Sequence, residues 1–132
     1  MALQFRRSIE ALPPLLVLTG DLACFLVFAA LGLRSHEGGI TLDGLLRAAV
    51  PFQIGWLLSV LFIAPRRSAA SDGVGGLLRV WVPAWIVGLV LRSVVLGRAF
   101  APTFAIVSLL VNGLLLLVWR IAARRLIGAR LR

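Results

Sequence analysis

Four long apolar runs divide the chain, and short polar or glycine-rich segments separate them. Runs of about 17–25 apolar residues suffice to cross the hydrocarbon core of a bilayer as α-helices. The pattern therefore predicts an all-α protein, a bundle of four membrane-spanning helices that forms one membrane domain over residues 1–132. The predicted spans are about 12–33, 48–64, 77–97 and 103–123, followed by a basic C-terminal tail at 124–132.

The polar connections carry local signals for helix ends. Thr41 stands where it can cap the helix that leads into the second span. Asp43 and Arg47 are four residues apart with the acid first, which predicts an ion pair on one helix face. Pro102 suits the first position of the fourth helix, because its missing N–H would be unpaired there in any case.

The arginines lie mainly at the ends of the apolar runs and predict the orientation. With the N-terminus inside, the cytoplasmic flanks carry ten arginines and the outer flanks three, a strong positive-inside bias. We therefore expect both termini in the cytoplasm, in a multi-pass protein of a prokaryotic cell (inner) membrane. The inner set is Arg6, Arg7, Arg66, Arg67, Arg79, Arg120, Arg124, Arg125, Arg130 and Arg132, and the outer set is Arg34, Arg47 and Arg98.

Composition agrees with this assignment. The chain is 61% hydrophobic with a formal net charge of +9, a balance that is ordinary for a polytopic membrane protein. Since the basic residues flank apolar runs, anionic lipid headgroups are the expected partners and nucleic acid is not. The predicted headgroup contacts are Arg6, Arg7, Arg66, Arg67, Arg120, Arg124 and Arg125, and the tail is expected to lie along the headgroups as an amphipathic helix.

Few residues offer catalytic or metal-binding chemistry. Cys24 is the one cysteine and His36 the one histidine, so this chain offers neither an internal disulfide nor a bis-histidine haem site. No nucleophile–base pair, phosphate-binding loop or metal-ligand spacing is present. We expect no enzymatic activity, no metal and no cofactor.

Each predicted span contains a polar residue in its interior. Asp21 lies near the middle of the first run, where an unpaired carboxylate costs on the order of 2.5–3.5 kcal/mol. Helical spacing predicts one shared inner face, on which Arg92 is a candidate partner for Asp21. The candidate pathway or binding residues are Asp21, Gln53, Arg92 and Asn112, with Trp56 and Trp85 beside them.

This cluster has two interpretations. It can line a polar path with Asp21 as a protonatable or cation-binding group, or it can hold the helices in order and register. Trp81 and Trp119 are placed as interfacial belt residues. The first interpretation favours a small transporter or channel-like protein, which we expect to act as a homo-oligomer. The second favours a non-catalytic accessory or scaffold subunit of a larger membrane complex.

Short motifs along nearly the whole chain resemble a known family. The sequence is similar to a family of small prokaryotic four-helix integral membrane proteins catalogued as a domain of unknown function. That resemblance implies a four-helix membrane fold, but it implies no activity and brings no catalytic residue. The motifs are Asp21, Arg34-Ser35-His36, Pro51-Phe52, Gly55-Trp56, Arg92, Gly97-Arg98, Phe100, Pro102, Phe104 and Trp119-Arg120.

Overall fold

The computed structural model describes residues 14–36, 38–63 and 74–130, and within these ranges the chain is helical with no strand. Each of its four helices is long and apolar enough to span a membrane, which confirms the predicted all-α fold. In chain order they are α2 (Pro14–His36), α3 (Leu42–Phe62), α4 (Val74–Val95) and α5 (Pro102–Arg130).

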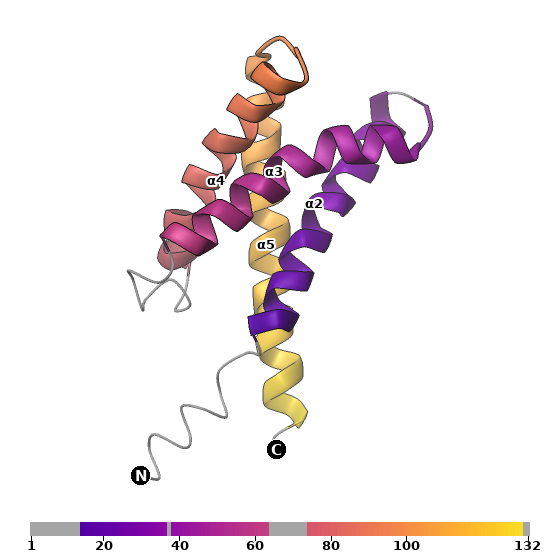
Figure 1. Ribbon diagram of the computed structural model, residues 1–132. Coiled ribbons are helices and arrows are strands. Elements are labelled where there is room, and N and C mark those ends of the chain that lie inside the picture. The colour runs from indigo at the N-terminus through magenta and orange to yellow at the C-terminus, as the bar shows by residue number, and fades with distance from the viewer. Residues whose placement is uncertain (1–13, 37, 64–73, 131–132) are drawn as a thin grey trace.

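The helices alternate in direction along the chain. The α2–α3 and α4–α5 connections lie at one end of the molecule, and the start of α2 and the end of α5 lie at the other (Figure 1). Helix α3 crosses obliquely and packs against both α4 and α2, while α5 packs against α2 and α4. The two ends of the described chain therefore share a side, and their cytoplasmic placement stays a prediction.

Local signals placed several helix ends correctly. The Thr41 hydroxyl accepts a hydrogen bond from the Gly44 N–H at 3.1 Å, which confirms the cap. Arg47 Nε donates to Asp43 Oδ1 at 3.1 Å, which confirms the predicted pair, and α5 begins at Pro102.

Two boundaries differ most from the prediction. Helix α3 begins at Leu42, several residues before the predicted span, because the Thr41 cap starts a helix that runs through Pro51 without a break. Helix α5 continues to Arg130, so the tail up to that residue extends α5 and does not form a separate helix along the headgroups. The tail contains no proline and no helix-ending turn that would interrupt it before Arg130.

Small residues let α3 and α4 approach closely. A Cβ atom on Gly55 of α3 would lie against the carbonyl oxygen of Ala84 on α4. A Cβ atom on Gly88 of α4 would meet the ring of Phe52 at 2.5 Å. Membrane helices lack a hydrophobic drive to associate, so this close backbone contact and its van der Waals packing hold the pair together.

Aromatic side chains fill the space between the helices. Phe25, Phe52, Trp56 and Trp81 are all fully buried, and the rings of Phe25 and Trp81 are tilted with centroids 5.6 Å apart. The expected interfacial position of Trp81 is therefore wrong. Its indole points inward between helices, on the face of α4 that helical spacing shares with Trp85 and Gly88.

Candidate functional site

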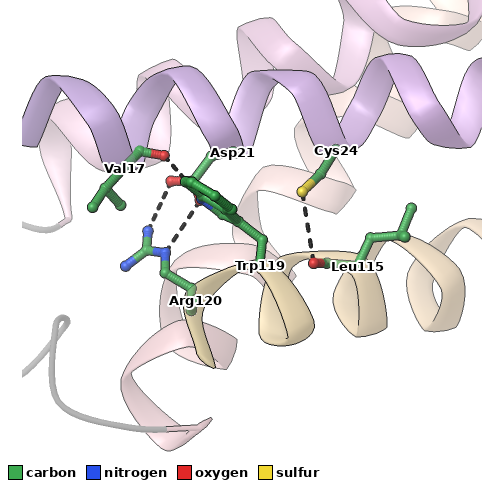
Figure 2. A network of polar contacts seen from close by, with 6 residues as sticks. All are labelled: Val17, Asp21, Cys24, Leu115, Trp119 and Arg120. Atoms are coloured by element: carbon green, nitrogen blue, oxygen red, sulfur yellow. Dashed lines mark hydrogen bonds and ion pairs between the residues drawn. The ribbon is translucent and has the colours of Figure 1, made fainter. Parts of the chain in front are cut away.

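Asp21 on α2 forms a two-pronged ion pair with Arg120 on α5. Arg120 Nε donates to Oδ1 of Asp21 at 3.1 Å, and Nη2 donates to Oδ2 at 2.8 Å (Figure 2). Asp21 is 1% exposed, and the Arg120 side chain is 20% exposed. The planar guanidinium matches both carboxylate oxygens, so this pair joins the first and last helices with charge-assisted hydrogen bonds.

The predicted pairing of Asp21 with Arg92 is wrong. Arg92 places its guanidinium carbon 3.7 Å from the centroid of the Phe104 ring, at the start of α5. Phe104 and Arg120 are sixteen positions apart on one continuous helix, or about 24 Å at helical rise. Helices α2 and α5 run antiparallel (Figure 1). Asp21 therefore contacts α5 far from the turn that Arg92 contacts.

Arg120 is the site residue that the sequence reasoning misplaced. It was expected to contact lipid headgroups because it follows a long apolar run. A signal was present: Arg120 lies eight residues after Asn112 and four after Leu116, both fully buried, and so continues the inward face of α5. The apolar sequence also resumes directly after it, at residues 121–123.

Helix α3 brings two predicted site residues to this ion pair. Gln53 Nε2 donates to the backbone carbonyl of Leu22, the residue after Asp21, at 3.1 Å. The Trp56 ring lies beside Arg120, with 5.9 Å between its centroid and the guanidinium carbon. Three helices therefore meet around Asp21.

Two further contacts join α2 and α5 on either side of the pair. Trp119 Nε1 donates to the carbonyl of Val17 at 3.3 Å, and its indole lies where a side chain on Gly20 would be (Figure 2). Cys24 Sγ donates to the carbonyl of Leu115 at 3.6 Å, so this small buried residue also joins α2 to α5. Trp119 is thus a helix-contact residue, and its expected place in an interfacial belt is corrected.

A second group of polar contacts joins α4 and α5. Trp85 Nε1 donates to Ser108 Oγ at 3.0 Å and to the carbonyl of Ala105 at 3.2 Å. Trp81 Nε1 donates to the carbonyl of Leu109 at 3.1 Å. Both indoles belong to α4, and the three acceptor atoms belong to residues 105–109 of α5.

Asn112 lies in the same stretch of α5 but bonds within its own helix. Its Nδ2 donates to the carbonyl of Ser108 at 3.0 Å, while its buried Oδ1 has no hydrogen-bond partner among the described residues. The buried Nε1 of Trp56 likewise lacks a hydrogen bond of ordinary geometry, although it lies close enough to the Asp21 carboxylate to act on its charge. These two are the buried side-chain atoms that the described residues leave without a hydrogen bond.

The predicted inner face therefore separates into three places. Asp21 pairs with Arg120 beside Trp56, and Gln53 bonds the next residue of α2. Trp85 bonds Ser108 of α5, to whose carbonyl Asn112 also donates, and Arg92 lies against Phe104 at the start of α5. The sequence pattern identified the inward faces of the helices, but it did not determine the depth at which their residues meet.

The remaining predicted residues are the arginines expected to contact lipid headgroups. Arg124 and Arg125 are exposed on α5, while Arg6, Arg7, Arg66 and Arg67 lie outside the described residues. Their contact with headgroups stays a prediction. In the part of the chain that the structure describes, no group of three or more His, Cys, Asp or Glu side chains is placed to hold a metal ion.

Four apolar helices joined by interior polar contacts define a multi-pass helical membrane protein. Residues 18–123 match the family described as "Protein of unknown function (DUF3054)", and the chain belongs to this family. The match confirms the resemblance to a domain of unknown function with four helices. Comparisons with curated proteins and with solved structures found no match.

Proposed function

We propose that this protein is a non-catalytic accessory or scaffold subunit of a larger membrane complex. The observation that supports this proposal is the pairing of Asp21 with Arg120. Both carboxylate oxygens accept hydrogen bonds from one guanidinium group of the same chain. A buried acid held in this way fixes the relation between two helices and has little capacity left for a cation or a substrate.

The other interior donors support the same role. Gln53, Trp81 and Trp119 each donate a hydrogen bond to a backbone carbonyl on a neighbouring helix. Such bonds contribute about 0.6–2 kcal/mol each in membrane proteins, so together they favour one helix order and register. A fixed arrangement of this kind suits a subunit that presents constant outer surfaces to a partner.

Apolar side chains cover the outer faces of all four helices. This surface suits contact with lipid or with the helices of another membrane protein. Members of the set, each at least 45% exposed, are Val27 and Leu31 on α2, Leu61 and Phe62 on α3, Ile86 and Val90 on α4, and Leu110 and Leu114 on α5.

A small transporter or channel-like protein is the second candidate. The two unpaired buried atoms, Trp56 Nε1 and Asn112 Oδ1, favour it, because buried polar atoms normally have a hydrogen-bond partner and water or an ion supplies one. In this alternative Asp21 would release Arg120 during transport and bind a proton or a cation.

Flux through liposomes separates the two candidates. The subunit proposal predicts that proton and cation flux through liposomes with purified protein equals that of empty liposomes. The transport alternative predicts flux that Asp21→Asn abolishes. Asp43→Asn is the matched control, because Asp43 is also paired with an arginine but at an exposed position.

Site-specific cross-linking in native membranes tests the subunit proposal directly. A photoreactive residue replaces one exposed side chain per helix, at Val27, Leu61, Val90 or Leu110, with buried Phe25 as the negative control. The proposal predicts one protein adduct of constant mass from one or two adjacent helices. Lipid adducts alone from all four helices would contradict it.

A further inference from the structure

A polar cavity lies between the start of α3 and the end of α4, away from the Asp21–Arg120 pair. Its volume is about 130 Å³, far above the roughly 10–15 Å³ needed for one water molecule on the same measure. Three arginines line it: Arg47 from α3, Arg92 from α4 and Arg98 from the α4–α5 connection. Thr41 and Asp43 complete its polar wall.

The cavity carries excess positive charge. Arg47 is neutralised by Asp43, with Nε of the arginine 3.0 Å from Oδ2 of the acid. Among the described residues no carboxylate pairs with Arg92 or Arg98, and these two guanidinium groups repel each other. An anion bound between them would remove that repulsion.

Phe104 holds the central arginine in place. The guanidinium carbon of Arg92 lies 3.7 Å from the centroid of the Phe104 ring, in a cation–π contact. This contact uses the flat face of the guanidinium group and leaves its N–H edges available as donors. Arg92 is therefore pre-organised, while Arg98 and Arg47 are exposed at the mouth of the cavity.

We propose that this cavity binds a phosphoryl group, in a free phosphate or in a lipid headgroup. Guanidinium groups recognise phosphate through paired N–H donors. A phosphoryl group presents its oxygens in a tetrahedral arrangement, so guanidinium groups that approach from three sides can each find an acceptor. A carboxylate has only two oxygens in one plane.

Either source fits the surroundings of the cavity. A free phosphate fits the exposed mouth formed by Arg47 and Arg98. A lipid whose phosphate binds in the cavity would place its acyl chains along strongly exposed apolar side chains. These are Leu42, Val94 and Val95, which are close in sequence to residues that line the cavity. This inference does not depend on the subunit or transport role proposed above.

Binding to the full-length protein in an uncharged detergent tests the proposal. The probes are inorganic phosphate and short-chain phosphatidic acid, with the matching diacylglycerol as the neutral control. Calorimetric titration gives the dissociation constant, and the rise in Tm on adding each probe gives a second readout. We expect Arg98→Gln to weaken phosphate binding about tenfold or more, since it removes a charge-assisted contact.

Matched variants separate binding from folding. Arg98 is exposed and has no ion pair among the described residues, so Arg98→Gln should not lower the Tm measured without probe. Arg92→Lys keeps the charge but loses the paired donors, and it should weaken binding as well. Arg79→Gln removes an exposed arginine of α4 that does not line the cavity, and it should bind like the parent.

Asp43→Asn should have the opposite effect. It removes the acid from the cavity wall and releases Arg47, so phosphate binding should tighten. Saturable binding of inorganic phosphate would show that a free phosphate is sufficient for binding. Binding of phosphatidic acid without binding of inorganic phosphate would identify a lipid headgroup as the ligand. Absence of binding by both probes, or equal binding by the parent and Arg98→Gln, would overturn the proposal.

Discussion

Asp21 and Arg120 should each prove necessary to the stability of the fold. Replacing either one alone should cost more than half of the free energy of unfolding that is lost when both are replaced. Asp21 is 1% exposed and the Arg120 side chain 20% exposed, so either charge alone would remain in mainly apolar surroundings. Loss of one partner from a buried ion pair costs about 3–5 kcal/mol. Asp21→Asn and Arg120→Gln should each lower the free energy of unfolding by about 3 kcal/mol.

The double variant measures the coupling between the two residues. It leaves two neutral amides and no isolated charge, so its loss should be about 1–3 kcal/mol smaller than the sum of the single losses. Denaturant unfolding in detergent micelles, followed by tryptophan fluorescence, gives these free energies. Losses that add within about 0.3–0.5 kcal/mol would refute the reasoning.

Two further double-mutant cycles serve as controls for the size of the coupling energy. Asp43 and Arg47 form an exposed pair, for which the coupling energy should be about 0.3–0.5 kcal/mol. Asp21 and Arg92 contact residues of α5 that lie sixteen positions apart, Arg120 and Phe104, so their substitutions should be additive. Strong coupling between Asp21 and Arg92 would indicate that these two residues pair, as the sequence pattern suggested.

Two packing predictions use the same unfolding assay. Gly55→Ala should destabilise by about 1–3 kcal/mol, because its Cβ would overlap the carbonyl oxygen of Ala84. Gly32→Ala is the matched control, because nothing lies within 4 Å of the new Cβ, and it should be neutral or slightly stabilising. Equal losses of unfolding free energy for the two variants would contradict the close approach of α3 and α4. Trp81→Phe should cost at least about 1 kcal/mol, because the variant loses ring contacts and the hydrogen bond to the Leu109 carbonyl, and an unchanged free energy of unfolding would contradict that contact.

The helices themselves were predictable from the sequence because their signals are local. Long apolar runs determine that four helices form, and Thr41 and Pro102 act within one turn of the helix ends that they define. The face of each helix that points inward was also predictable, since a helix repeats every 3.6 residues. Asp21, Trp56 and Asn112 are all buried as that spacing indicated.

The depth at which residues of different helices meet was not predictable. The fourth span was predicted to end near residue 123 with Arg120 at the lipid headgroups, whereas the helix continues to Arg130 and Arg120 lies on its inward side. A shift of one turn moves a residue by about 5.4 Å, enough to exchange one partner for another.

Solid-state NMR in lipid bilayers tests the central claim most directly, through the contact between the Asp21 carboxyl carbon and the side chain of an arginine. The structure predicts a short-range cross-peak from Asp21 to the Arg120 guanidinium group, since an N–H nitrogen of that group lies 2.8 Å from the carboxylate oxygen. A cross-peak from Asp21 to Arg92, or to water with none to Arg120, would contradict it.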